Sequence, residues 1–200
     1  PDHDLESPHF DQRVRLHSIS WSEYESLLAM RGEHSGVRIT YLEGELELMT
    51  PSIDHEALKT QLARLLEAYA EERDLELEGY GSWTVKSAAK ARGVEADECY
   101  TIGSRTTPPE RPDLAIEVIW TSGGIDKLDV YCSLGVPEVW FWQEGSLRFY
   151  ILHGDAYMPS SRSHLIPELD PALIVRCMGE TSQTRAVRAF RAALRESPTR

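Results

Sequence analysis

An apolar run over residues 114–120 places the strongest constraint on how this chain can fold. A short run that is apolar at nearly every position is typical of a strand buried on both faces at the centre of a sheet. The run holds one carboxylate, Glu117, and a charge buried there without a partner would be costly. The sequence therefore predicts a central strand and marks Glu117 as a candidate functional residue.

Helical patterns lie before and after this strand. Ser20 and Glu23 form a capping box, and Gly135 suits the left-handed cap at the end of a helix. The longest pattern places its leucines on one face, as expected for a helix that covers a sheet. The predicted helices span about 20–30, 53–73, 125–134 and 181–194.

Strands are predicted for most of the remaining chain. Alternating runs at 37–41 and 45–49 indicate a hairpin near the N-terminus, and runs at 138–142 and 147–152 indicate a second hairpin. Further strands are expected near 75–85, 97–102 and 172–177. Together with the helices, these runs predict a mixed α/β (α+β) fold in which a mixed central sheet is flanked by helices. Residues 1–16 lack periodicity, so we expect a flexible N-terminal lead followed by a single domain over 17–196.

The charge of the chain bears on its partners. A net charge of -12 argues against a strongly basic nucleic-acid binder. It leaves a nuclease open, because carboxylates cluster where a metal is held and basic residues can gather on one face. Candidates for such a face are Lys86, Lys90 and Arg92, and the C-terminal Arg185, Arg188, Arg191 and Arg195. The C-terminal set is better explained as solvated surface charge.

Composition favours a cytoplasmic protein. No apolar run approaches the roughly 18 residues of a membrane span, and the first residues are polar, so no signal peptide is visible. The three cysteines are few, odd in number and widely spaced, which favours reduced thiols over disulfides or a zinc site.

Two carboxylates and a lysine form the candidate site. Asp97 and Glu117 each lie on or beside a short apolar strand, and Lys127 follows closely in the sequence. A carboxylate pair bridged by a divalent metal, with a nearby cation, can activate water and stabilise a phosphoryl transition state. The residues themselves therefore favour metal-dependent phosphodiester chemistry.

The order of these motifs resembles the Uma-two family of endonucleases, in the restriction-endonuclease-like PD-(D/E)XK superfamily. The resemblance rests on the Glu-Ala-Asp strand, the Pro-Asp-Leu-Ala-Ile-Glu-Val strand, the Asp-Lys helix and the Gly-Val-Pro-Glu-Val-Trp strand. It covers about residues 20–194 and is most specific over 112–140. It implies a restriction-endonuclease-like core, with Mg²⁺ or Mn²⁺ held at a split in the central strands.

The resemblance also implies roles for single residues. Asp97 is similar to the aspartate of the PD motif, although Ala96 stands where proline is usual, and Glu117 is similar to the acid of the (D/E)XK motif. Ile119 stands where the motif lysine is expected, and the lysine is expected to have moved to Lys127 in the following helix. Asp97, Glu117 and the Ile119 backbone carbonyl would hold the metal.

Three further residues are accessory candidates with open alternatives. His55 could contact the substrate or the metal shell, or serve as a capping or packing histidine. Glu45 matches the family, yet its alternation with leucines also fits a plain strand carboxylate. Asp113 fits a cap at the entry of the strand better than a site role.

Two classes of function remain open at this point. The first is a metal-dependent endonuclease that hydrolyses phosphodiester bonds of nucleic acid, with DNA as the expected substrate. The second is a noncatalytic binding or scaffold protein that retains the fold, which the acidic charge and Ile119 favour. The aromatic run Trp140-Phe141-Trp142 hints at a homodimer, but core packing explains it equally well.

Overall fold

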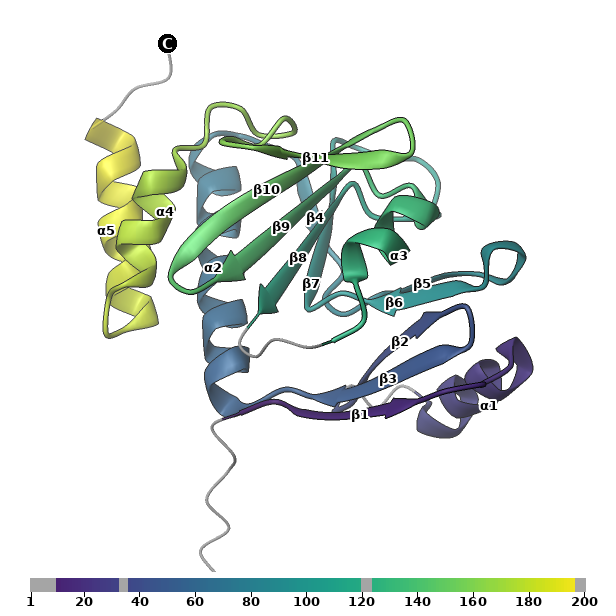
Figure 1. Cartoon of the computed structure of the whole chain (residues 1–200). Coiled ribbons are helices and arrows are strands. Elements are labelled where there is room, and N and C mark those ends of the chain that lie inside the picture. The colour runs from purple at the N-terminus through teal and green to yellow at the C-terminus, as the bar shows by residue number, and fades with distance from the viewer. Residues whose placement is uncertain (1–9, 33–35, 120–123, 197–200) are drawn as a thin grey trace, which may run out of the picture.

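Two β-sheets and five α-helices make up the described part of the chain, shown in Figure 1. The structure is a computed structural model that describes residues 10–32, 36–119 and 124–196. The predicted mixed α/β class is confirmed. The predicted N-terminal hairpin is present, but it belongs to a second sheet rather than to the sheet that contains the central strand.

The five-stranded sheet is antiparallel and has the order β1-β3-β2-β6-β5. Its strands are β1 (Gln12–Leu16), β2 (Arg38–Leu42), β3 (Glu45–Thr50), β5 (Thr84–Ser87) and β6 (Arg92–Glu95). The β2–β3 hairpin turns through Glu43 and Gly44, which both have positive φ angles, 47° and 96°. A two-residue turn with this geometry matches the twist of its flanking strands, as the sequence predicts.

The six-stranded sheet is mixed and has the order β11-β10-β9-β8-β7-β4. Its strands are β4 (Leu77–Gly79), β7 (Glu98–Ile102), β8 (Leu114–Ile119), β9 (Glu138–Gln143), β10 (Ser146–His153) and β11 (Ala156–Ser160). Only the β8–β9 pair is parallel among the described strands. β8 lies inside the sheet and is buried from Leu114 to Val118, which confirms the predicted central strand. Trp120, at the end of the apolar run, lies outside the described residues.

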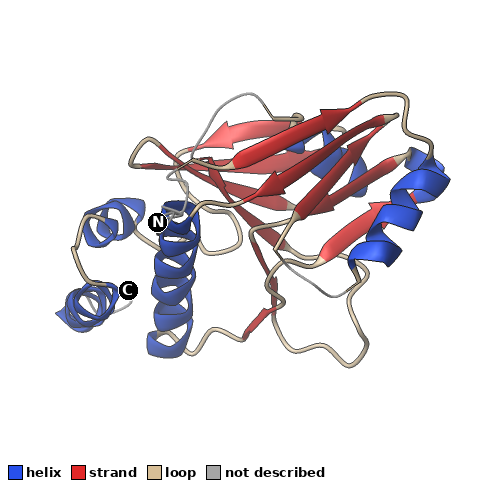
Figure 2. Cartoon of the chain, turned by 90° about the horizontal axis from the view of Figure 1, so that it is seen from below, coloured by secondary structure: helices blue, strands red, loops and turns tan. Residues whose placement is uncertain are grey.

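Four of the five described helices cover the six-stranded sheet, and the first one packs against the five-stranded sheet. They are α1 (Trp21–Arg31), α2 (Ile53–Glu72), α3 (Lys127–Leu134), α4 (Pro171–Met178) and α5 (Gln183–Glu196). α2, α4 and α5 pack together over one face and lie to one side of the strands (Figure 2). α3 packs on the other face. The capping box of Ser20 and Glu23 and the left-handed cap at Gly135 (φ 74°) are confirmed.

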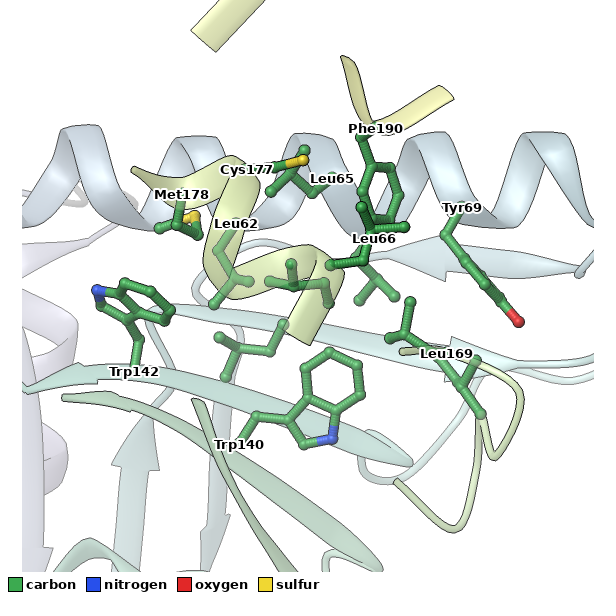
Figure 3. Close-up of a cluster of buried hydrophobic side chains, with 14 of the residues drawn as sticks. Leu62, Leu65, Leu66, Tyr69, Trp140, Trp142, Leu169, Cys177, Met178 and Phe190 are labelled. Atoms are coloured by element: carbon green, nitrogen blue, oxygen red, sulfur yellow. The ribbon is translucent and has the colours of Figure 1, made fainter. Parts of the chain in front are cut away.

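The main hydrophobic core lies between α2 and the six-stranded sheet (Figure 3). Leu62, Leu65 and Leu66 of α2 are fully buried and belong to the same apolar cluster as Trp140 of β9. Trp140, Phe141 and Trp142 are at most 9% exposed. Core packing therefore accounts for these aromatic residues, and they offer no surface for a homodimer.

Two sequence predictions of local structure are wrong. Residues 12–16 belong to the predicted flexible lead, but they form β1, which pairs with β3 along its whole length. Residues 172–177 were expected to form a strand, but they lie in α4. Asp170 caps this helix by accepting a hydrogen bond from Ala172 N (3.0 Å), and Pro171 occupies its first position. β6 and β11 are additional strands that the sequence patterns did not predict.

The chain crosses from one sheet to the other at Ala96-Asp97. β6, in the five-stranded sheet, ends at Glu95, and β7, in the six-stranded sheet, begins at Glu98. Asp97 therefore lies at the junction of the two sheets, which is where the candidate site forms.

Candidate active site

Glu117 is the buried acid of β8, and α3 supplies both of its side-chain partners. Only 2% of Glu117 is exposed. Lys127 Nζ lies 2.5 Å from Glu117 Oε2, and the Tyr131 hydroxyl donates a hydrogen bond to Oε1. Lys127 and Tyr131 are four residues apart, so they lie on the same face of α3. Lys127 is thus in direct contact with a candidate carboxylate, as the expected migration of the motif lysine to α3 requires. Sequence reasoning missed Tyr131, although its i, i+4 spacing from Lys127 is a usable signal.

Asp97 lies beside Glu117 at the sheet junction. In the antiparallel β7–β8 pair, Glu98 is opposite Ile116 and Cys99 is opposite Ala115, so one further step places Asp97 level with Glu117. Asp97 Oδ2 accepts a hydrogen bond from Val118 N (2.8 Å). The other carboxylate oxygen, Oδ1, is buried, lies 3.9 Å from Arg38 Nε and accepts no hydrogen bond among the described residues. Such an oxygen is costly to bury unless something else, such as a cation, satisfies it.

His55 connects Asp97 to the N-terminal segment. It is fully buried in the first turn of α2, with Nε2 3.0 Å from Asp97 Oδ2 and Nδ1 3.1 Å from Asp11 Oδ2. Asp11 also accepts a hydrogen bond from Ser52 N (2.9 Å), the N-cap residue of α2. Three buried ionisable groups therefore form a line that ends at the candidate aspartate. Sequence reasoning missed Asp11 because it lies in the segment predicted to be a flexible lead.

A second buried acid, Glu47 of β3, holds the segment that enters α3. Glu47 is 2% exposed, and its carboxylate accepts a hydrogen bond from Ile125 N (3.2 Å). It also contacts Arg13 (3.3 Å) and Arg15 (3.5 Å) of β1. These contacts attach the first residues before α3, and with them Lys127, to the five-stranded sheet.

A pocket of about 250 Å³ opens beside these residues. Charged side chains on its wall come from two cations, Arg13 and Lys127, and two acids, Glu117 and Asp126. The remaining wall is largely apolar and includes Met49, Ile125 and Phe141. A concave, partly apolar pocket with a few converging charges is the usual form of a binding site.

Burial and neighbouring charges shift the pKa values of these groups in different directions. Burial raises the pKa of Glu117 to about 7, against the opposing influence of Lys127 and Tyr131. Burial would also raise the pKa of Asp97, but Lys127, His55 and the Val118 N–H together hold it below its usual range. For His55, burial is outweighed by Asp11 and Asp97, which raise its pKa to about 9. Two neighbouring carboxyls with opposite shifts are a frequent property of functional sites.

The donor set suits a hard divalent cation, although it is small. Among residues 10–32, 36–119 and 124–196, no group of three or more His, Cys, Asp or Glu side chains is arranged to hold a metal ion. Asp97 and Glu117 supply two carboxylates, and the Ile119 carbonyl is the third oxygen donor expected from the sequence. Mg²⁺ is commonly bound through one or two carboxylates, with its remaining positions filled by water and substrate phosphate. Asp97 Oδ1, which accepts no hydrogen bond among the described residues, fits such a cation.

Two accessory candidates lie away from this cluster. Glu45 is half exposed, and its nearest ionic partner is His17, at 3.6 Å. Asp113 lies at the other end of β8 from Glu117, where it accepts a hydrogen bond from Ile102 N (2.9 Å) and pairs with Arg105. Both therefore have local structural partners.

The basic residues considered for a nucleic-acid face are largely paired with acids. Lys86 contacts Glu25 (2.7 Å), and Arg92 contacts Glu43 (3.0 Å). At the C-terminus, Arg191 and Arg195 contact Glu72 at 2.8 and 2.7 Å. This arrangement agrees with solvated surface charge for the C-terminal arginines.

Comparison with known proteins identifies the family. Residues 21–176 match the model of the Uma2 family, described as "Putative restriction endonuclease". The chain belongs to this family. The Uma2 match includes Asp97, Glu117 and Lys127 but begins after β1. A search of curated proteins finds no match.

A solved structure supports the fold. The chain is similar to a "putative nuclease belonging to DUF820" from Anabaena variabilis, with a TM-score of 0.52 and 14% sequence identity. The similarity covers 86% of this chain and 99% of the other. At this identity, the comparison supports the shared fold alone. Among the described residues, no helix has both the length and the apolar character needed to cross a membrane.

Proposed function

We propose that this chain is a metal-dependent endonuclease that hydrolyses phosphodiester bonds of nucleic acid. The observation that carries the proposal is the contact of 2.5 Å between Lys127 and Glu117, on a central strand and level with Asp97. Buried charges of this kind contribute little to stability compared with apolar residues of the same size, so a functional reason for them is favoured. Membership of the Uma2 family supports the same reaction class.

Mg²⁺ or Mn²⁺ would be held by Asp97, Glu117 and the Ile119 carbonyl. When bound, the cation would supply positive charge to the phosphoryl group and ease the ionisation of water. The protein contributes two carboxylates from neighbouring strands, fixed by the sheet. Glu117 would share its oxygens between the cation, Lys127 and Tyr131, because each carboxylate oxygen can accept more than one contact.

Lys127 would act as the motif lysine, because Ile119 occupies the position where that lysine is expected. A catalytic cation is needed at a point in space, and Lys127 brings its ammonium to Glu117 from the first turn of α3. From there it would stabilise the charge that develops on the phosphate and help to orient the attacking water. Ile119 has neither a positive charge nor a proton to donate.

His55 would position Asp97 rather than react. Its ring contacts Asp97 Oδ2 from one side, while Val118 N donates to the same oxygen. These two contacts hold the carboxylate in one orientation and leave Oδ1 for the cation. Asp11, on the far side of the ring, fixes the orientation of His55 in turn.

Calorimetric titration with Mn²⁺ tests the metal site directly. Wild-type protein should bind Mn²⁺, and Asp97→Ala should abolish binding. Asp170→Asn is the matched control, because Asp170 also accepts a backbone hydrogen bond but caps the remote helix α4. Its Mn²⁺ affinity should equal that of wild type. Wild-type protein that binds neither Mn²⁺ nor Mg²⁺ would favour a noncatalytic binding protein that retains the fold.

Cleavage assays test the assigned roles. Purified protein with Mn²⁺ should cleave duplex DNA, and single-stranded DNA and RNA are the alternative substrates to compare. Lys127→Met should keep Mn²⁺ binding and lose cleavage, because the carboxylates remain and the cation at the phosphate is removed. Loss of Mn²⁺ binding in this variant would show that Lys127 organises the carboxylates instead.

A further inference from the structure

The N-terminal strand lies outside the family match, yet its segment reaches the candidate site. The match begins at residue 21, whereas Asp11 contacts His55 and Arg13 of β1 lines the pocket beside Glu117 and Lys127. The pattern shared by the family therefore assigns nothing to Arg13. Its role follows from its own surroundings.

We propose that Arg13 binds a phosphate group of the nucleic-acid substrate in the pocket that it shares with Lys127. The inference rests on the proposed nuclease function and deepens it, because it names a residue that holds the substrate backbone. Arginine presents five N–H donors in a planar fork that matches the oxygens of a phosphate. The proposed contact is to the substrate, so Arg13 would affect substrate binding without affecting the metal.

Buried acids hold Arg13 from the interior of the protein. Its Nη1 lies 3.3 Å from Glu47 Oε1, and its Nη2 lies 3.7 Å from Asp11 Oδ2. The side chains of these acids are 3% and 0% exposed, whereas that of Arg13 is 21% exposed. Arg13 is thus anchored on its inner side and accessible from the pocket that it lines. A side chain already held in one orientation loses less entropy when it binds a ligand.

Each of the two acids that hold Arg13 also contacts a second basic side chain. Glu47 is shared between Arg13 (3.3 Å) and Arg15 (3.5 Å), so two guanidinium groups face one carboxylate. Asp11 is shared between Arg13 and His55, and it lies closer to His55, at 3.1 Å. In a chain with a net charge of -12, two cations on the wall of one pocket, Arg13 and Lys127, are a specific feature that suits a phosphodiester.

Arg13 is also fixed relative to Lys127. A Cβ atom at Gly124 would lie 2.2 Å from Arg13 Nη1, so the guanidinium packs directly against the backbone that leads into α3. The next residue, Ile125, donates its N–H to Glu47, the same acid that holds Arg13. The two cations therefore line one pocket of about 250 Å³, on a shared support, with Glu117 beside Lys127.

Arg13→Met and Arg15→Met form a matched pair for the test. Both arginines lie on β1 and contact Glu47, but only Arg13 lines the pocket. Binding is measured by fluorescence anisotropy with a short labelled DNA duplex and its single strand, with Ca²⁺ in place of Mg²⁺ to slow cleavage. Arg13→Met should weaken binding about tenfold and reduce the slope of log affinity against log salt by about 1. Arg15→Met should change the affinity less than about twofold.

Two readouts separate a substrate contact from a structural effect. Mn²⁺ affinity should stay at the wild-type value in Arg13→Met, and Arg13→Lys should recover part of the lost DNA affinity because it restores the charge. If Arg13→Met does not fold, Arg13→Lys is compared with Arg15→Lys by DNA affinity in the same anisotropy assay. Here the expected result is a measurable loss for Arg13→Lys alone, because lysine keeps the charge but not the fork.

The outcomes distinguish this inference from the proposed function. If wild-type protein binds and cleaves nucleic acid while the variants at 13 and 15 bind equally well, the inference about Arg13 is overturned and the nuclease function stands. If wild-type protein neither binds nor cleaves DNA or RNA in the presence of Mn²⁺, both the proposed function and the inference about Arg13 are wrong.

Discussion

The core beneath α2 and the junction between the two sheets are both buried, but they are built from opposite kinds of side chain. Beneath α2, residues such as Leu62, Leu66 and Trp140 exclude water with apolar surface (Figure 3). At the junction, Asp97 and Glu117 are at most 2% exposed and carry ionisable groups. Apolar burial stabilises the fold at about 25 cal/mol per Å², whereas buried charges regain little of their desolvation cost. The first region therefore holds the protein together, while the second is kept for another reason.

The distinction gives an expectation for every substitution. Changes in the apolar core should reduce the free energy of unfolding and leave the chemistry of the folded protein unchanged. Changes at the junction should alter the chemistry and cost less stability. Proteins commonly give up stability at functional sites in this way.

Leu66→Ala should have the largest effect on stability. Leu66 is fully buried in the core beneath α2, and truncation leaves a cavity that costs about 3 kcal/mol of unfolding free energy. Urea denaturation followed by tryptophan fluorescence measures the change. Met30→Ala is the control, because Met30 is 75% exposed on α1 and should cost almost nothing. A changed Mn²⁺ affinity in folded Leu66→Ala would show that the apolar core and the sheet junction do not act independently.

Lys127→Met should destabilise the protein in a pH-dependent way when divalent cations are removed with EDTA. Lys127 opposes the rise in the pKa of Glu117, so its loss raises that pKa above the wild-type value of about 7. Below pH 7, Glu117 is protonated in both folded proteins, so the loss there is limited to the stabilisation that Lys127 gives to ionised Asp97. Above pH 7, Glu117 ionises in the wild type, while in the variant it must stay protonated or remain unpaired. The variant should therefore lose about 1–2 kcal/mol near pH 8.5.

The sign of this dependence follows from the raised pKa of Glu117. A carboxyl whose pKa is higher in the folded state binds more protons there, so its contribution to stability is complete below the unfolded pKa and is lost as pH rises through the folded pKa. Urea midpoints at pH 6 and pH 8.5 measure the effect. An equal loss at both pH values would show that Lys127 stabilises α3 by packing rather than through Glu117.

Glu117→Gln should change the unfolding free energy by less than about 1 kcal/mol and abolish cleavage. Glutamine keeps the shape of the side chain and removes a carboxylate that Asp97 repels, so above pH 7 the variant should be as stable as wild type or slightly more stable. Thermal unfolding and a cleavage assay give the two readouts. Glu45→Gln, at a half-exposed strand position, should leave both unchanged. A fall of many degrees in the melting temperature of Glu117→Gln would mark Glu117 as a structural ion-pair member.

Sequence patterns predict the fold well where one physical signal dominates. The capping box at Ser20 and the apolar run of β8 both predict elements that the structure contains. The run 172–177 was wrongly predicted as a strand because a short apolar segment fits either period. The cap at Asp170 and the first-turn Pro171 are the signals that decide for a helix. β1 was missed because its burial depends on pairing with β3, a contact distant in sequence.

Some residues of the candidate site can likewise be predicted from the sequence, and others cannot. Glu117 stands out in the sequence because a charge interrupts an apolar run, and His55 was considered because of its place in a recognised order of motifs. Asp11, Arg13 and Glu47 carry no such signal. Each becomes informative only when the five-stranded sheet brings β1 and β3 against α2 and the segment before α3. Local sequence patterns do not predict roles that depend on contacts between residues distant in the sequence.

Glu72→Gln, in a surface ion-pair cluster, should have the smallest effect. Arg195 and Arg191 lie 2.7 and 2.8 Å from Glu72 Oε1 and lower the pKa of Glu72 to about 2. These groups are solvated and their side chains lose freedom on pairing, so removing the charge should lower the melting temperature by only about 1–2 °C. A carboxyl with a lowered pKa stabilises above its unfolded pKa and loses that contribution as pH falls through the folded value. The difference in melting temperature between Glu72→Gln and wild type should therefore shrink as pH falls from about 4.5 toward 2.

This difference should also shrink in 1 M NaCl, whereas the pH-dependent loss in Lys127→Met should persist, because the Glu117 pair is shielded from salt. Equal sensitivity to salt at the two places would mean that the junction is as solvated as the surface, and the contrast between buried charge and apolar core would lose its basis.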